Sequence, residues 1–114
     1  APLLRPEVTR VVRDWMESVV ETDSVFGFPK IDGYRIGGKT GTADKFVNGQ
    51  FGGGLKVCSF VANLPVDNPK YVVLVVVDEP KGGGAYGSTV AAPVAKEIVE
   101  GLLVLEKIPP SIAQ

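Results

Sequence analysis

The chain has 114 residues, with 12 lysine and arginine residues against 13 aspartate and glutamate residues, and it contains no histidine. A chain of this length forms one domain at most. Its net charge of −1 and its scattered basic residues offer no phosphate-binding stripe, so we expect no nucleic acid partner. The longest apolar run, residues 72–77, is far shorter than the roughly 20 residues of a membrane-spanning helix. The N-terminus has no signal-peptide pattern, so we expect no targeting segment in this chain.

The chemistry open to this chain is narrow. Without histidine and with a single cysteine, Cys58, it cannot form an imidazole or thiolate zinc site, a Ser-His-Asp triad or an internal disulfide. We therefore expect no metal and no cofactor. Any catalysis would depend on lysine, serine, threonine, tyrosine or carboxylate side chains.

The first predicted element is an amphipathic helix over residues 6–20. Apolar residues recur there at steps of three and four, with charged residues between them, and Pro6 suits the first turn. The spacing places Trp15 and Met16 on the apolar side, so we expect both in the core. In the following loop, Phe26 and Phe28 are expected to anchor the chain to that core.

Three strands follow. Alternation predicts a glycine-rich strand over residues 34–42, a turn over 48–54 and a second strand over 56–63, with Cys58 buried in it. After a turn over residues 65–69, the apolar run 71–77 is typical of a strand covered on both faces. Asp78 and Glu79 at its end are expected to be solvated charges.

The last predicted element is a helix whose apolar positions run from Val90 to Leu103. A segment with four glycines, residues 80–87, precedes it, and Ser88 or Thr89 would cap its start. The order is helix, three-stranded antiparallel meander, helix, which indicates an α+β fold.

A glycine-rich stretch carries the strongest motifs. Residues 33–40 satisfy G-x-x-x-x-G-K-[ST], the phosphate loop of nucleotide-binding enzymes. That loop needs a helix directly after its lysine, and the glycines that follow here disfavour one. Nucleotide binding is therefore a minor alternative. The same residues, Lys39-Thr40-Gly41-Thr42, also match the Lys-Thr-Gly element of penicillin-binding proteins and β-lactamases.

Four blocks in order resemble the C-terminal part of a class B penicillin-binding protein, a peptidoglycan D,D-transpeptidase. They are residues 33–43, 65–73, 78–80 and 90–94. The resemblance implies that residues 1–114 are the C-terminal segment of an incomplete transpeptidase domain with the fold shared with serine β-lactamases. It implies a β-strand at the border of the active-site cleft, within a five-stranded antiparallel sheet.

The resemblance also implies residue roles. Lys39 would place its ammonium beside the nucleophilic serine and assist proton transfer, and Thr40 and Thr42 would bind the substrate carboxylate through their hydroxyls. Gly41 would let the D-Ala-D-Ala end of a stem peptide, or a β-lactam, lie against the strand. The backbone N–H of Thr42 would donate to the oxyanion.

The rest of the catalytic machinery is missing from this chain. Its serines are Ser18, Ser24, Ser59, Ser88 and Ser111, and none begins a Ser-x-x-Lys motif. No Ser-x-Asn or Tyr-x-Asn triplet occurs either. We expect the chain alone to be inactive and to need the remainder of its transpeptidase domain as a partner, with peptidoglycan stem peptides and β-lactams as ligands.

Besides nucleotide binding, two alternatives remain open, a non-catalytic binding or scaffold module with this fold and a serine β-lactamase. The resemblance further implies that the parent protein is held in the cytoplasmic membrane, with its catalytic domain outside the cytoplasm.

Overall fold

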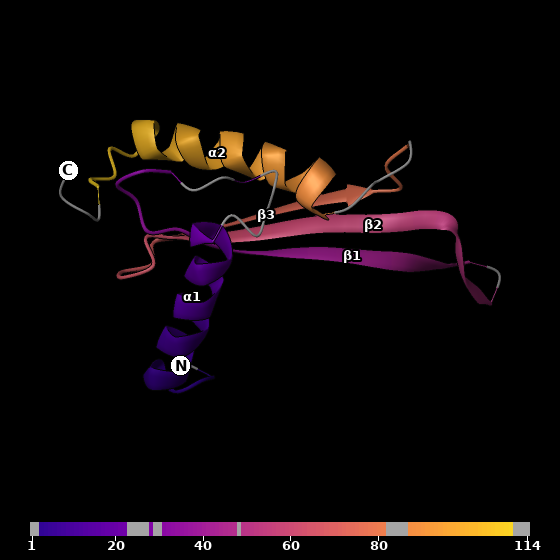
Figure 1. The fold of residues 1–114 in the computed structure, drawn as a ribbon, viewed down its shortest axis with the longest axis horizontal. Coiled ribbons are helices and arrows are strands. Elements are labelled where there is room, and N and C mark those ends of the chain that lie inside the picture. Colours follow the sequence, from indigo (N-terminus) through magenta and orange to yellow (C-terminus); the bar gives the residue numbers. More distant parts are fainter. Residues whose placement is uncertain (1–2, 23–27, 29–30, 48, 82–86, 111–114) are drawn as a thin grey trace.

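The computed structural model describes residues 3–22, 28, 31–47, 49–81 and 87–110. Its elements follow the predicted order of a helix, three strands and a helix (Figure 1). They are α1 (Pro6–Glu21), β1 (Gly37–Val47), β2 (Gln50–Leu64), β3 (Tyr71–Asp78), one π-helical turn η1 (Gly87–Ala91) and α2 (Ala92–Leu105). The predicted α+β class is confirmed.

The strands form an antiparallel meander in the order β1-β2-β3, with β2 in the centre. The β1–β2 hairpin is longer than predicted, because β2 begins at Gln50 and so includes the residues expected in a turn. β1 begins at Gly37, three residues later than predicted, and its register shifts between Asp44 and Phe46.

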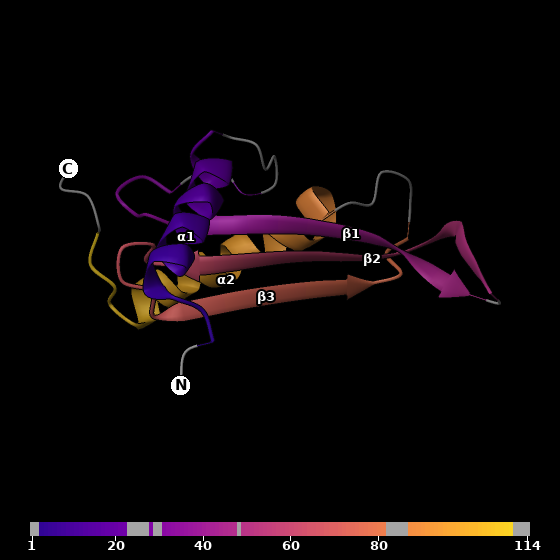
Figure 2. The ribbon, with the colours of Figure 1, turned by 90° about the horizontal axis from the view of Figure 1, so that it is seen from below.

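The core lies between the sheet and α2, which runs along one face of it (Figures 1 and 2). Alternate residues of β2 point into this layer and are buried: Cys58, Phe60, Ala62 and Leu64. The α2 side contributes residues at steps of three and four: Ala92, Ala95, Val99 and Leu103. Phe28 stacks on Phe60 with ring centroids 5.0 Å apart, so its predicted anchoring role is confirmed, as is the burial of Cys58. Phe26 lies outside the described residues.

On the opposite face, α1 contacts one end of the sheet, with its C-terminal half nearest the strands and its N-terminal half pointing away from them (Figure 1). Val20 is buried and Met16 half-buried, but Trp15 is 67% exposed, so its predicted place in the core is wrong. Periodicity identified the apolar side of α1 but not how much of that side the sheet would reach. The prediction that β3 is covered on both faces is also wrong for this chain, since Val72, Leu74 and Val76 are exposed.

The last helix begins at Ala92, with Ala91 at its N-cap position, and not directly after Ser88 or Thr89. The π-helical turn η1 occupies residues 87–91 and packs on β2 and β1. Among the described residues, no helix combines the length and apolar character needed to cross a bilayer.

Candidate functional site

The Lys-Thr-Gly residues lie near the start of β1, at the edge of the sheet. Lys39 is opposite Val61, Gly41 opposite Ser59 and Thr42 opposite Cys58. Within the described part of the chain, β1 pairs with β2 alone. In an antiparallel edge strand, every second residue directs its N–H and C=O away from its partner strand, so β1 offers main-chain groups to a further extended chain.

The side chains of the four residues alternate between the two faces of the sheet. From the register, Lys39 and Gly41 share a face with Val61 and Ser59, whereas Thr40 and Thr42 lie on the face that carries α2. Lys39 is exposed, and its Nζ donates a hydrogen bond to the Thr40 carbonyl oxygen at 2.9 Å. Thr42 is exposed and Thr40 half-buried. The strand therefore carries an ammonium on one face of the sheet and two hydroxyls on the other, with backbone groups along the edge between them.

Two glycines allow close approach at this edge. A Cβ on Gly38 would lie 2.5 Å from Cζ of Phe60, inside the core, so β1 can pack on that ring only without a side chain there. A Cβ on Gly41 would lie 2.5 Å from Oγ of Ser59, on the face that Lys39 shares. The absence of a side chain at Gly41 therefore gives the Ser59 hydroxyl its space beside β1.

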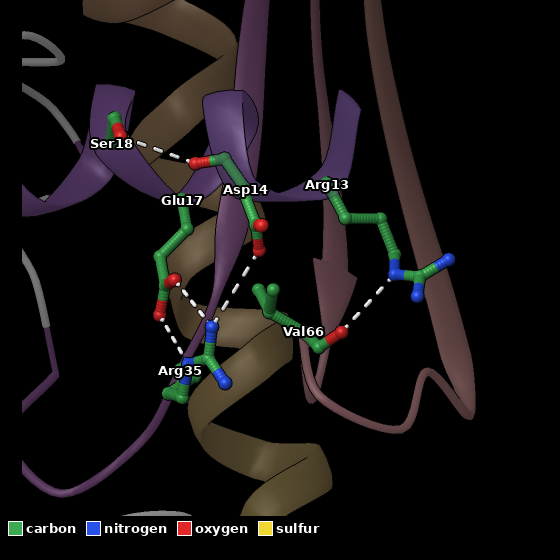
Figure 3. A network of polar contacts seen from close by, with 6 residues as sticks. All are labelled: Arg13, Asp14, Glu17, Ser18, Arg35 and Val66. Carbon is green, nitrogen blue, oxygen red and sulfur yellow. Dashed lines mark hydrogen bonds and ion pairs between the residues drawn. The ribbon is translucent and has the colours of Figure 1, made fainter. Parts of the chain in front are cut away.

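A polar cluster joins α1 to the chain just before β1 (Figure 3). Arg35 donates two hydrogen bonds of 2.8 Å, from Nε to Oε2 of Glu17 and from Nη2 to Oε1, and its Nη2 lies 3.7 Å from Oδ1 of Asp14. The Arg35 carbonyl accepts a hydrogen bond from the Val66 N–H at 2.9 Å, and the Val66 carbonyl accepts one from Nε of Arg13 at 3.1 Å. We call these five residues, Arg13, Asp14, Glu17, Arg35 and Val66, the α1 clasp.

The α1 clasp was not predicted from the sequence. Glu17 and Arg35 are 18 positions apart and lie in a helix and a loop, so no local spacing pairs them. Glu17 raises the pKa of Arg35 above its usual range, chiefly through the hydrogen bonds between them. The guanidinium is therefore charged at every pH at which the protein is folded.

A second ion cluster links β1 to the end of β3. Nζ of Lys45 lies 3.1 Å from Oδ1 of Asp78 and 2.9 Å from Oε1 of Glu79. Both carboxylates are exposed, as expected for solvated charges, and both also pair with Lys45. The hydrogen bonds that Lys45 donates, chiefly to Glu79 and then to Asp78, raise the pKa of Lys45.

The site is an open edge without an enclosing pocket in the described part of the chain. A hollow of about 370 Å³ lies between the β2–β3 connection and the end of α2, and no residue from Lys39 to Thr42 lines it. No group of three acidic, histidine or cysteine side chains that could hold a metal occurs among the described residues. The strand continues to Val47 after Lys39 and Thr40, so the helix that a phosphate loop requires does not follow them.

Comparison with known proteins identifies the family to which this chain belongs. The family model described as "Penicillin binding protein transpeptidase domain" matches residues 4–100. The chain belongs to this family. The family resemblance expected from the four sequence blocks is thereby confirmed, and so is the fold class.

Relatives and solved structures agree with the family match. The chain is 45% identical over 111 residues to the "Peptidoglycan D,D-transpeptidase FtsI homolog" of Mesostigma viride, covering 94% of this chain and 18% of that protein. It is similar to the apo transpeptidase domain of Burkholderia pseudomallei penicillin-binding protein 3, with a TM-score of 0.81 and 39% identity over 96% of this chain and 33% of that one. It is also similar to Mycobacterium tuberculosis penicillin-binding protein 3 complexed with ampicillin, with a TM-score of 0.73 and 26% identity over 91% of this chain and 25% of that one.

The chain spans about a fifth of the length of the curated relatives that it matches, and a third of the Burkholderia domain. The family is therefore established from a segment of the domain that includes the Lys-Thr-Gly strand.

Proposed function

We propose that this chain supplies the Lys-Thr-Gly side of the active site of a peptidoglycan D,D-transpeptidase. The observation that carries the proposal is the position of Lys39-Thr40-Gly41-Thr42 on the edge strand of a penicillin-binding transpeptidase fold, with Lys39 and Thr42 exposed. The substrate class is the D-Ala-D-Ala terminus of a stem peptide, and β-lactams are inhibitors that imitate it.

The open edge of β1 supports binding of an extended peptide. An extended chain that adds to a sheet edge gains main-chain hydrogen bonds, and Gly41 presents no side chain of its own to that chain. The hydroxyls of Thr40 and Thr42 and the ammonium of Lys39 provide polar and positive groups for the terminal carboxylate. The backbone N–H of Thr42 is assigned as one of the donors to the oxyanion of the tetrahedral intermediate.

The covalent step takes place on a serine outside this chain. The serine Oγ attacks the carbonyl carbon of the penultimate D-Ala, the peptide C–N bond breaks, and the terminal D-Ala leaves with a proton on its amine. An amine of a second stem peptide then attacks the acyl-serine and restores the free serine. Lys39 assists proton transfer around the serine hydroxyl. The remainder of the transpeptidase domain is thus the obligatory partner of residues 1–114.

The test is acylation of the full-length protein by a penicillin, followed by intact mass spectrometry under denaturing conditions. We expect the wild-type protein to gain the mass of the drug. Lys39→Met should slow acylation by about 100-fold or more, since positioned proton transfer typically contributes 100- to 10,000-fold. The matched control is Lys45→Met. It removes another lysine of β1, one that pairs with Asp78 and Glu79, and this variant should be acylated at close to the wild-type rate.

Each alternative has its own outcome in this experiment. A full-length protein that gains no mass would overturn the proposal and favour a non-catalytic module. Rapid release of hydrolysed drug would favour a serine β-lactamase. Equal slowing by Lys39→Met and Lys45→Met would remove the role assigned to Lys39.

We further propose that the parent protein is anchored in the cytoplasmic membrane with this domain outside the cytoplasm. The proposal follows from family membership, since peptidoglycan cross-linking takes place outside the cytoplasm. Labelling of intact cells with an impermeant penicillin probe should reach the protein. Labelling only after lysis would contradict this location.

A further inference from the structure

Among the described residues, β1 pairs with β2 along one edge, the C-terminal half of α1 lies across one face at the start of the strand, and η1 also packs on β1. The contact with α1 is tight, because a Cβ on Gly37 would lie 3.0 Å from Cβ of Met16 and 2.9 Å from Oδ1 of Asn63. The other edge of β1 has no strand partner in this part of the chain. The position of the strand edge therefore depends on how α1 is fixed against the start of β1.

The α1 clasp supplies that fixation in polar form. Arg35 is two residues before β1 and four before Lys39, and Glu17 holds it with two hydrogen bonds in the fork geometry that restricts a guanidinium most. The pair is partly buried, since the side chains of Arg35 and Glu17 are 32% and 16% exposed. Val66 connects Arg35 to α1, because its N–H donates a hydrogen bond to the Arg35 carbonyl and its own carbonyl accepts one from Arg13 of α1.

We propose that the Arg35–Glu17 pair is a positioning element for the Lys-Thr-Gly strand, setting where Lys39 and the Thr42 N–H lie relative to the reacting serine. The inference rests on the proposed function. It assigns no contact with substrate to Arg35 or Glu17, which act through β1. A misplacement of a catalytic group by about 1 Å can lower the rate roughly 100-fold. Fixing the start of β1 would therefore help to keep the catalytic groups on this strand in position.

The experiment measures penicillin acylation of the full-length protein under single-turnover conditions, well below the melting temperature. Arg35→Met removes the charge and both hydrogen bonds while keeping an aliphatic stem, and Glu17→Gln is the milder partner variant. We expect each to lower the limiting acylation rate constant by about 10- to 100-fold with a smaller change in the half-saturating drug concentration. Arg35→Lys, which keeps the charge, should recover part of the rate.

Two comparisons separate positioning from a loss of general stability. The double variant Arg35→Met/Glu17→Gln should be no slower than Arg35→Met alone, because both changes remove one shared interaction. The control is Lys96→Met, which removes the Lys96–Glu100 ion pair of α2, remote from the start of β1, and should leave acylation unchanged. Wild-type acylation constants in folded Arg35→Met and Glu17→Gln would overturn the inference, as would equal slowing by Lys96→Met.

Hydrogen exchange of the β1 amides keeps this test independent of the proposed function. Without the Arg35–Glu17 pair, the amides of residues 37–42 should exchange faster than in the wild type, while those of α2 stay unchanged. If the wild-type protein is not acylated, the proposed function fails, and unchanged exchange in β1 would then overturn the positioning role by itself. If Arg35→Met does not fold, Glu17→Gln and Arg35→Lys provide both measurements.

Discussion

Gly38 and Gly41 lie three positions apart in β1, yet a methyl group at each would meet a different kind of neighbour. At Gly38 it would meet the ring of Phe60, which is buried and stacked on Phe28. At Gly41 it would meet the hydroxyl of Ser59, a small group that can turn away by rotating about one bond. The two glycines therefore serve different purposes, one in packing and one at the open edge.

We predict opposite results for alanine at these two positions. Gly38→Ala should lower the free energy of unfolding by about 1–3 kcal/mol, because the core must shift to accept the extra group. Gly41→Ala should change stability by less than about 0.5 kcal/mol, but slow penicillin acylation by about tenfold or more if an extended ligand lies against this strand.

Urea unfolding of the full-length variants and their acylation rates measure both effects. A Gly41→Ala protein that acylates at the wild-type rate would contradict the substrate-facing assignment of that glycine. A Gly38→Ala protein of unchanged stability would show that the Phe60 ring moves at no cost.

At the scale of elements, Lys45 connects β1 to the last residue of β3 and to Glu79 just beyond it, across the central strand. Its pKa in the folded protein is raised by these hydrogen bonds above the ordinary value, which is about 10.4. A raised folded-state pKa means that the pair's contribution to stability is complete below pH 10.4 and is lost as the pH rises through the higher folded-state value.

We predict that the melting temperatures of wild type and Lys45→Met differ by a constant amount up to about pH 10 and converge above it. Thermal unfolding between pH 8 and 11.5 measures this, and high salt should reduce the difference because the ion pair is at the surface. A difference that grows with rising pH would contradict the assigned sign.

The two helices differ in how much of their length packs against the sheet. α2 buries residues along its whole length against β2 and β3, whereas α1 touches the sheet with its C-terminal half and leaves Val8, Val11, Val12 and Trp15 exposed. The amphipathic pattern is clearer in α1, the helix that leaves more of its apolar side exposed, than in α2. Pattern alone therefore predicts that a helix has an apolar side, but not whether this chain or another one covers it.

At the scale of the whole molecule, one face of the sheet carries a row of exposed apolar residues. Val72, Leu74 and Val76 are 71%, 63% and 55% exposed, and β3 pairs on one edge with β2 and on the other with no strand of the described chain. Exposed apolar strands at a sheet edge favour pairing with another chain. This chain covers a third of the similar Burkholderia domain. We therefore expect the remainder of the domain to pack against this row of exposed apolar residues.

We predict that the 114-residue chain produced alone self-associates, and that replacing Val72, Leu74 and Val76 with lysine reduces this association. Light scattering after size-exclusion chromatography measures the mass. The control replaces Val94 and Val104, which are exposed on α2, with lysine and should leave the association unchanged. A monodisperse wild-type monomer would contradict the prediction of a companion.

The sequence by itself determined the order of the elements, the family and the Lys-Thr-Gly residues, because each depends on local spacing or a contiguous motif. Periods of two and of three to four residues mark strands and helices without any knowledge of distant contacts. The limits of β1 and β2, the start of α2 and the exposure of Trp15 depended on packing between elements, which spacing does not report. Only the tertiary structure decided that Arg35 meets Glu17 and Val66 and that Lys45 meets Asp78 and Glu79. Those contacts join residues that are distant along the chain, and folding alone brings them within hydrogen-bonding distance.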